Sequence, residues 1–119
     1  MLRSGVDLIE INRLSDINPS IRERFIERVF TENEIAICKG NDINLSGRFA
    51  AKEAISKALG TGIGEIHWKD IEILQKENGE PFVNLHAKAK QKEIELGITM
   101  WSLSISHSRN LAIAFVVAA

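Results

Sequence analysis

The residues best suited to chemistry lie in one stretch with helical periodicity, from Arg48 to Leu59. Glu53 and Lys57 are spaced to share one side of that helix, opposite an apolar stripe, and Gly60 and Gly62 follow its end. A lone carboxylate among cationic and donor groups suits a metal ion and phosphates. An exposed i,i+4 ion pair has the same spacing and contributes only about 0.2–0.5 kcal/mol. The spacing alone leaves both interpretations open.

A second carboxylate, Asp7, lies in a stretch expected to form a strand, Val6 to Ile11. In period-2 alternation Asp7 shares its face with Gly5 and Ile9, whereas Glu10 points to the opposite face. A carboxylate on an apolar face is unfavourable unless it is paired, hydrogen-bonded or bound to a metal. Mg²⁺ needs only one or two carboxylates when substrate phosphates complete its ligands, so Asp7 is a candidate ligand and Glu10 is expected to be structural.

The first half of the chain carries clear helix signals. Asn18 followed by Pro19 predicts the start of a helix, because Asn caps helices and Pro suits their first turn. Ile21, Phe25 and Val29 recur at helical spacing and are expected to form the buried stripe of that helix.

Two further helices are expected before the middle of the chain. Thr31 and Glu34 have the spacing of a capping box, and Lys39-Gly40 is expected to end the helix that they begin. The next helix, which carries Glu53, is expected to begin between Asn44 and Ser46.

The second half predicts four strands and one helix. The final run is continuously apolar, as in a strand that is covered on both faces. These elements indicate an α+β domain with a mainly antiparallel sheet and packed helices. The expected ranges are Trp68–Leu74, Phe82–Leu85, Trp101–Ser106 and Leu111–Ala118 for the strands, and Ala87–Leu96, ended by Gly97, for the helix.

Size and composition fit one soluble domain spanning residues 1–119. The chain is 45% hydrophobic and 26% charged, as in ordinary globular domains. Its net charge of −1 and its lack of a basic aromatic stretch predict no nucleic-acid partner. No apolar run is long enough for a membrane span, and the single Cys38 cannot form an internal disulfide, so we expect a cytoplasmic protein in which Cys38 is a packing residue.

Three segments together resemble a known family. The string GRFAAKEAISKALGTG, Gly47 to Gly62, resembles the signature of the holo-acyl-carrier-protein synthases, the small bacterial 4'-phosphopantetheinyl transferases. Gly5–Ile11 with the following Arg13, and Ser104–Ser108 before the terminal apolar run, are similar to the two ends of that family's chains. Weaker similarity covers Arg24–Glu34 and Trp68–Ile73. The resemblance therefore extends over nearly the whole chain, in order.

The resemblance implies the 4'-phosphopantetheinyl transferase fold, with three copies around a threefold axis and active sites at subunit boundaries. It implies that a serine hydroxyl of an apo acyl carrier protein attacks the β-phosphate of coenzyme A, and adenosine 3',5'-bisphosphate leaves. Asp7 and Glu53 are implied to hold Mg²⁺, while Lys57 and His107 stabilise developing charge. The general base is either Glu53 or a metal-bound water, and the sequence does not decide between them.

The resemblance also implies two sets of binding residues. Glycines in a turn would let backbone amides approach the phosphates of coenzyme A. A lone histidine such as His107 is more often a packing residue, and the resemblance favours a phosphate contact for it. His67 and His86 match no motif and are expected to be surface or packing residues. Acyl carrier proteins are acidic, and arginine pairs well with carboxylates. The implied coenzyme A contacts are Arg48, Lys57, Gly60, Gly62, His107 and Ser108, and the implied carrier contacts are Arg13, Arg24 and Arg28.

The sequence also allows two other classes of function: a non-catalytic module that binds coenzyme A or a carrier, and a purely structural trimer. Asp7, Glu53, Lys57 and His107 occur together although packing needs none of them, which favours the enzyme. The sequence leaves open which carriers and acyl-coenzyme A donors are accepted and whether Mn²⁺ replaces Mg²⁺. The short segment 39–45 also leaves the access to the pocket open.

Overall fold

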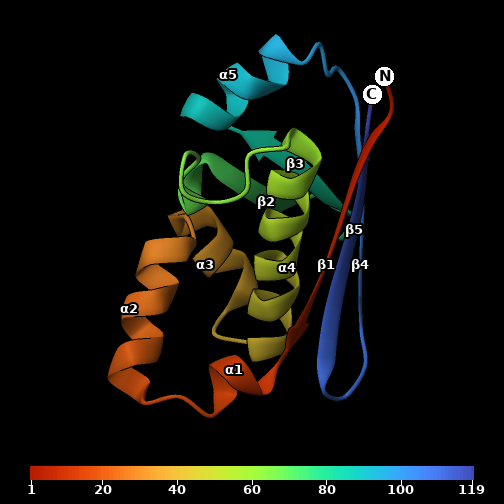
Figure 1. The fold of residues 1–119 in the computed structure, drawn as a ribbon. Coiled ribbons are helices and arrows are strands. Elements are labelled where there is room, and N and C mark those ends of the chain that lie inside the picture. Colours follow the sequence, from red (N-terminus) through yellow and green to blue (C-terminus); the bar gives the residue numbers. More distant parts are fainter.

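The computed structural model describes residues 1–119, which form two antiparallel sheets and five α-helices (Figure 1). The larger sheet has the strand order β1-β5-β4, and β2 pairs with β3 in the smaller one. This arrangement confirms the expected α+β class with antiparallel pairing. The strands are β1 (Arg3–Glu10), β2 (Ile71–Gln75), β3 (Pro81–Leu85), β4 (Trp101–His107) and β5 (Leu111–Ala118), and the helices are α1 (Asn12–Ser15), α2 (Pro19–Val29), α3 (Glu32–Cys38), α4 (Asp42–Leu59) and α5 (Ala87–Glu95).

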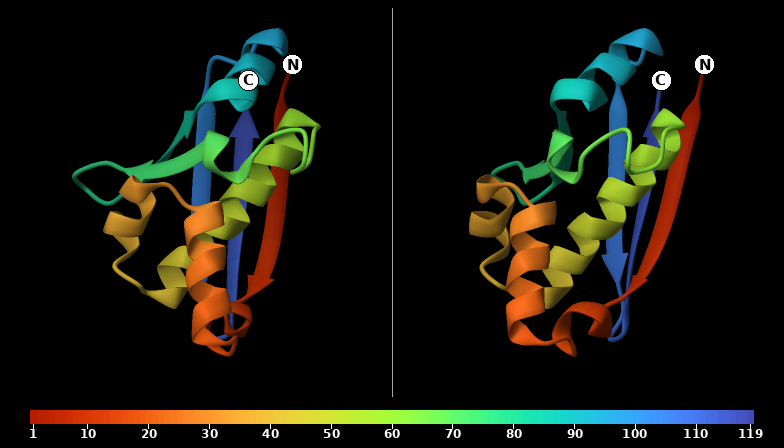
Figure 2. Two further views of the ribbon diagram at one scale, coloured as in Figure 1. Left: turned by 90° about the vertical axis from the view of Figure 1, so that its left-hand side faces the viewer. Right: turned by 60° about the vertical axis from the view of Figure 1, so that its left-hand side comes forward.

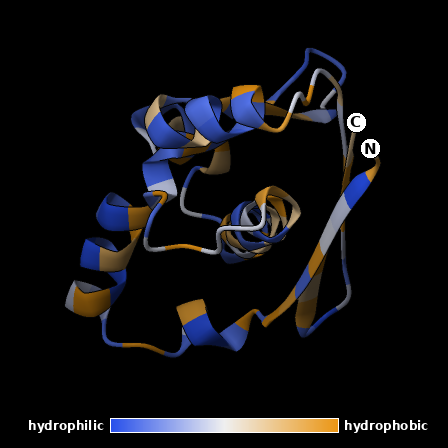
Figure 3. Cartoon of the chain, turned by 45° about the horizontal axis from the view of Figure 1, so that its top comes forward, coloured by the Kyte–Doolittle hydropathy of each residue, from blue (hydrophilic) through white to orange (hydrophobic).

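Helix α4 stands in the middle of the molecule, with the three-stranded sheet on one side and α2 on the other (Figures 1 and 3). Its alanine-rich side is fully buried against the sheet, where small side chains permit a close approach. A Cβ atom on Gly5 would lie 1.8 Å from the carbonyl oxygen of Ala54. Glycine at this position therefore lets β1 lie directly against α4, which places Asp7 beside the same helix.

The outer face of the three-stranded sheet is apolar and uncovered. In β5 alternate residues are buried, and Phe115 on the outer face keeps 48% of its surface exposed. Val6 and Leu8 of β1 continue the same face, as do Leu111 and Ile113 of β5. The expectation that Leu111–Ala118 is covered on both faces is therefore wrong within one chain, because no element of the chain packs on the outer side.

The helix-start signals in the first half are confirmed. Asn18 Oδ1 accepts a hydrogen bond from Ser20 N at 2.9 Å, and Pro19 is the first residue of α2. Thr31 and Glu34 form both hydrogen bonds of a capping box at α3, which ends at Lys39 in the left-handed conformation. The side chains that cap these helices act locally, so their spacing in the sequence was sufficient to predict them.

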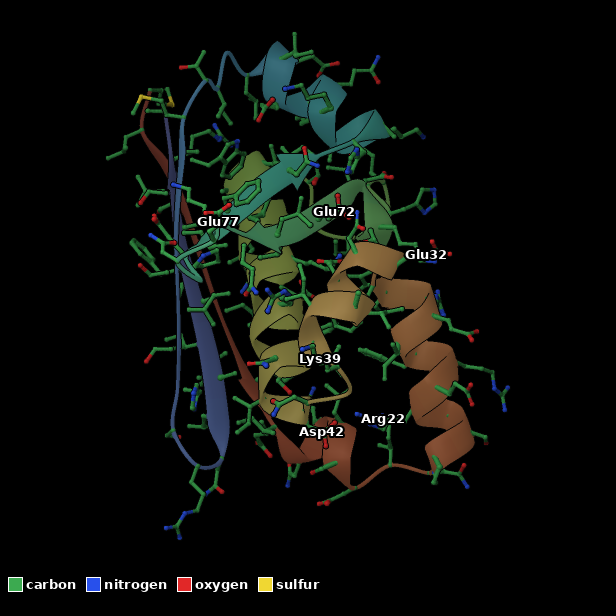
Figure 4. All side chains as sticks on the ribbon, turned by 180° about the vertical axis from the view of Figure 1, so that it is seen from behind. Arg22, Glu32, Lys39, Asp42, Glu72 and Glu77 are labelled. Atoms are coloured by element: carbon green, nitrogen blue, oxygen red, sulfur yellow. The ribbon has the colours of Figure 1, made fainter.

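Two boundaries and one core residue differ from expectation. Helix α4 begins at Asp42, earlier than the predicted 44–46, because Asn41 Oδ1 caps it and Arg22 pairs with Asp42 (Figure 4). Ile21 is 55% exposed rather than buried, since nothing in the chain covers the first turn of α2.

The predicted strand Trp68–Leu74 is divided. Trp68–Asp70 form a short 3₁₀ turn, η1, because the Asp70 carboxylate accepts a hydrogen bond from His67 N, and β2 starts at Ile71. The β2–β3 hairpin, α5 with its stop at Gly97, and the β4–β5 hairpin occur as expected. None of the helices combines the length and apolarity needed to cross a bilayer.

Candidate active site

Asp7 and Lys57 meet where β1 contacts α4. Lys57 Nζ lies 3.1 Å from Asp7 Oδ1 and donates a second hydrogen bond to the carbonyl oxygen of Val6 at 2.9 Å. Lys57 thus pairs with Asp7 across the fold, and it forms no ion pair with Glu53, its i−4 neighbour. The i,i+4 surface pair of Glu53 with Lys57 that the spacing allowed does not form, and the strand carboxylate Asp7 contacts Lys57 of α4 instead.

Glu53 lies on the same side of α4 and interacts electrostatically with both residues. Partial burial raises the pKa of the Glu53 carboxyl, the charge of Asp7 raises it further, and Lys57 lowers it. Asp7, Glu53 and Lys57, which we call the Asp7 group, carry two carboxylates and one ammonium and therefore a net charge of −1 (−2 + 1). The chain places no third acidic, histidine or cysteine group with them. Two hard oxygen donors suit a Mg²⁺ ion whose remaining ligands are waters and phosphates.

Arg48 and His107 line a separate hollow of about 220 Å³ between α4, the β2–β3 turn and the end of β4. Arg48 is 7% exposed, and its Nε donates to the carbonyl oxygen of Ile73 at 3.1 Å. That bond fixes a cationic side chain in the wall of the hollow. The other lining residues are Ile43, Asn44, Gly47, Gln75, Gly79, Pro81 and Ile105.

Helix α4 separates this hollow from the Asp7 group. Asp7 pairs with Ala114 of β5, which pairs in turn with Ile105 of β4, so two strand spacings lie between β1 and the hollow. Gly47 packs α4 closely against Ile105 on that far side. The structure therefore does not bring His107 and Arg48 together with Asp7, Glu53 and Lys57 within one chain.

The Gly60-Thr61-Gly62 turn does not offer its amides to an anion. Gly60 N donates to the carbonyl oxygen of Lys57, and the amides of Thr61 and Gly62 both donate to that of Ser56. These N–H groups end helix α4, and the expected contacts of Gly60 and Gly62 with coenzyme A stay a prediction. Both glycines have positive φ angles, 79° and 66°, which explains why glycine occurs there.

Ser108 and Cys38 have structural partners. Ser108 Oγ accepts a hydrogen bond from Leu111 N at 3.2 Å and so closes the β4–β5 turn next to His107, outside the lining of the hollow. Cys38 is 1% exposed, and burial raises the pKa of its thiol, which keeps it protonated and confirms its packing role.

The arginines expected to bind a carrier are exposed and form no ion pairs within the chain. Arg24 and Arg28 of α2 line a hollow of about 320 Å³ together with Ile21 and Phe25. Arg13 lies on α1 and lines no hollow with them. The structure brings two of the three arginines together beside apolar side chains.

A buried ion pair went unrecognised in the sequence. Lys52 and Glu34 have fully buried side chains, and Lys52 Nζ lies 2.7 Å from Glu34 Oε1 while it also donates to the carbonyl oxygens of Trp68 and Ile71. Glu34 Oε2 accepts from Ile73 N at 2.9 Å. Lys52 therefore fixes α4 to α3 and β2 one residue before Glu53. The only available signal was its four-residue spacing from Arg48 on the side away from Glu53.

Glu72 forms a second polar cluster that periodicity could not reveal (Figure 4). Its carboxylate accepts hydrogen bonds from Thr31 Oγ1, Asn33 Nδ2 and Asn84 Nδ2, and His86 Nε2 lies 3.0 Å from it. Burial raises the pKa of Glu72, but these hydrogen bonds outweigh burial and hold the pKa below its usual value. His86 is half exposed, as expected, yet it joins this cluster rather than the Asp7 group.

The chain thus carries a strand carboxylate and a helix carboxylate beside a lysine, and a hollow with a buried arginine on the other side of α4. The chain belongs to the 4'-phosphopantetheinyl transferase superfamily, whose family model matches residues 3–116. Within that superfamily its relatives are holo-[acyl-carrier-protein] synthases. The protein of Natranaerobius thermophilus is 47% identical, covering 92% of this chain and 90% of its own, and that of Herpetosiphon aurantiacus is 45% identical over 98% of both.

A solved structure agrees with these relatives. The Helicobacter pylori holo-[acyl-carrier-protein] synthase, in complex with coenzyme A, matches with a TM-score of 0.87 and 37% identity over 98% of this chain and 99% of that chain. The fold and the sequence therefore point to the same group of enzymes, as the resemblance implied.

Proposed function

We propose that this chain transfers the 4'-phosphopantetheine group of coenzyme A to a serine of an apo acyl carrier protein in the cytoplasm. The observation that carries the proposal is the meeting of Asp7, Glu53 and Lys57 at the contact of β1 with α4. The complex of the Helicobacter pylori relative with coenzyme A supports coenzyme A as the co-substrate.

Asp7 and Glu53 are the residues that would hold Mg²⁺. Burial raises the pKa of Glu53, the charge of Asp7 raises it further, and a dication would relieve the repulsion between the two carboxylates. When bound, the ion supplies positive charge that neutralises the pyrophosphate of coenzyme A. Lys57, with half of its side chain exposed, contacts Asp7 and presents its ammonium to solvent, where it would stabilise charge that develops on the phosphates.

Of the two bases that the sequence leaves open, Glu53 is the one supplied by the chain itself, and it would receive the proton of the carrier serine. Its partial burial raises the pKa of its carboxyl and makes it a better base than an exposed glutamate. In the reaction the serine oxygen bonds to the β-phosphorus of coenzyme A. The bond from that phosphorus to the bridging oxygen breaks, and adenosine 3',5'-bisphosphate leaves with the electron pair.

The hollow of Arg48 and His107 would bind the remaining phosphate charge of coenzyme A. Arg48 supplies a fixed cation in its wall, and His107 lies at the open end of β4. Because α4 separates this hollow from Asp7, the two halves of the site would be joined by using the hollow of a neighbouring copy.

This division supports the homotrimer with active sites between subunits that the family resemblance implies. β1 and β4 are the two edges of the larger sheet, and each carries a site residue, Asp7 and His107. A head-to-tail contact of the β4 edge of one copy with the β1 edge of the next would join them, and repeating it closes a ring. The uncovered apolar face around Phe115 would be buried in that ring.

The carrier would dock on α2. Arg24 and Arg28 are exposed and unpaired, and they flank apolar side chains in one hollow. Arginine forks match carboxylates, so an acidic carrier is a suitable partner, with Arg13 as a further contact.

Mass spectrometry of an apo acyl carrier protein incubated with this chain, coenzyme A and Mg²⁺ tests the transfer. We expect one phosphopantetheine group to be added to the carrier, and none without Mg²⁺. A carrier of unchanged mass under conditions where a known synthase modifies it would refute the proposed function. Light scattering at working dilution tests the trimer, because a fully active monomer would contradict shared sites.

A further inference from the structure

Strand β1 is fastened to the C-terminal half of α4 at three points along one face of the strand. Figures 1 and 2 show the start of β1 beside the end of this helix. Arg3 Nε donates a hydrogen bond to the carbonyl oxygen of Ala58 at 2.6 Å, and Gly5 lies against the helix backbone. Asp7, the third point, contacts Lys57. Side chains alternate along a strand, so residues 3, 5 and 7 all face α4.

The side chain of Arg3 completes the end of helix α4. The amides of Thr61 and Gly62, which follow the helix, both donate to the carbonyl oxygen of Ser56. They therefore leave the carbonyl of Ala58 to the half-buried guanidinium of Arg3, whose charge also suits the negative end of the helix dipole. Arg3 forms no ion pair in the chain, so its attachment to α4 is the polar interaction that its side chain makes.

Lys57 has two carboxylates with which its ammonium could pair. Glu53 lies four residues earlier on the same side of α4, at the spacing where ion pairs form along a helix. The structure instead shows Lys57 Nζ at 3.1 Å from Asp7 Oδ1 and at 2.9 Å from the carbonyl oxygen of Val6. Half of the Lys57 side chain is exposed, so burial does not impose this choice. The choice depends on how closely β1 lies against the last turn of the helix, since both acceptors belong to the strand.

We propose that Arg3 is a positioning residue, which clamps the start of β1 to the end of α4 and so keeps Lys57 paired with Asp7. Lys57 directly precedes Ala58, the residue that Arg3 holds, and loss of the clamp would let this last helical turn fray. Lys57 would then pair with Glu53 along the helix, which would make that carboxylate less available to the ion or to the carrier serine. The inference rests on the proposed function, in which Glu53 must be free to act.

Steady-state kinetics of Arg3→Met test the clamp, because methionine keeps an unbranched stem and removes every donor. We expect kcat for the transfer to fall about tenfold while the KM for the carrier stays unchanged. Arg3→Lys keeps a charge and a donor, so it should recover most of the turnover. Arg22→Met is the matched control and should leave kcat unchanged. Arg22 donates to the carbonyl oxygen of Gly40 and pairs with Asp42 at the opposite end of α4, away from the Asp7 group.

Combining Arg3→Met with Lys57→Met separates positioning from general stabilisation. If Arg3 acts through Lys57, the double variant should turn over as fast as Lys57→Met alone. A further tenfold loss in the double variant would overturn the proposal, since Arg3 would then act independently of Lys57. Equal kcat values for Arg3→Met and the Arg22→Met control would overturn it as well.

Urea unfolding of the metal-free chain distinguishes a failure of the clamp from a failure of the proposed function, because it requires no turnover. Double-variant cycles of Lys57→Met with Asp7→Asn and with Glu53→Gln measure which carboxylate is coupled to Lys57. The larger coupling should be with Asp7 when Arg3 is present and with Glu53 when Arg3→Met is added. An unchanged preference for Asp7 in Arg3→Met would overturn the clamp and leave the proposed function intact. An unmodified carrier with the unaltered chain would instead refute the proposed function.

Discussion

Replacing Glu53 by Gln separates the functional role of this residue from a structural one. The substitution keeps the shape of the side chain and changes the charge of the Asp7 group from −1 to zero. Glu53 has a pKa raised by burial and by Asp7, so its ionised form is less stable in the folded chain than in the unfolded chain. Such a group adds stability at pH values below its unfolded pKa and loses it as pH rises through its folded pKa.

The free energy of unfolding of metal-free Glu53→Gln should therefore exceed that of the unaltered chain at pH 7. The difference should disappear as pH falls below the ordinary glutamate pKa, about 4.3. Urea unfolding at several pH values measures this. A variant that is less stable than the unaltered chain at pH 7 would mean that the Glu53 charge stabilises the fold, contrary to the geometry.

Mg²⁺ should reverse this order of stability, so that the unaltered chain has the larger free energy of unfolding. At an ion concentration ten times its dissociation constant, binding stabilises the folded state by about 1.4 kcal/mol, roughly 5 °C in midpoint for a domain of this size. Glu53→Gln should show little of this gain. Its turnover of the carrier should fall by at least about a hundredfold, about 3 kcal/mol of lost transition-state stabilisation.

Two further variants complete this experiment. The turnover of Asp7→Asn should fall as far as that of Glu53→Gln. The turnover of the double variant should be scarcely lower, because both carboxylates are proposed to act around one ion. Glu10→Gln is the control, since Glu10 is exposed on the opposite face of β1, and it should keep most activity. Near-normal turnover of Glu53→Gln at limiting Mg²⁺ would refute the metal assignment.

Three other outcomes are expected. Arg24→Glu should raise KM for the carrier about tenfold without changing KM for coenzyme A, and added salt should reduce the effect, as steady-state kinetics would show. Lys52→Met should lower the free energy of unfolding in urea by about 3–5 kcal/mol, because Glu34 is left charged and fully buried. Ala87→Gly should raise the thermal midpoint, since Ala87 has a φ of 48° at the start of α5 and relief of that conformation is worth about 1 kcal/mol.

The sequence predicted those parts of the fold that local chemistry determines. The caps at Asn18 and Thr31 and the stop at Gly97 act on residues a few positions away, so their spacing was enough. Ile21 was placed wrongly because helical spacing identifies an apolar stripe without showing which turns another element covers. The outer face of β5 was misjudged for a similar reason, since an apolar strand looks the same whether its cover comes from the same chain or from another.

The sequence suggested candidate residues for the site and could not show their contacts. Asp7, Glu53 and Lys57 were identified from pattern and resemblance, but the pairing of Lys57 with Asp7 depends on how closely β1 approaches α4. The sequence could not show that the amides after α4 donate hydrogen bonds to carbonyl oxygens of the same helix. The sequence also could not distinguish Lys52 from an exposed lysine, because the two differ only in how the folded chain buries them.

These missed features explain why the two carboxylates stay together despite their repulsion. Lys52, whose side chain is fully buried, anchors α4 to α3 and β2 through three hydrogen bonds, which oppose a rotation of the helix that would move Glu53 away. Gly5 lets β1 lie against the same helix, so the strand holds Asp7 in place. Burial raises the pKa of Glu53 and the repulsion by Asp7 raises it further, so both effects are built into the packing of the chain. A site held this way would need no rearrangement to receive the proposed Mg²⁺, and such preorganisation is the condition under which electrostatic stabilisation of a transition state is most effective.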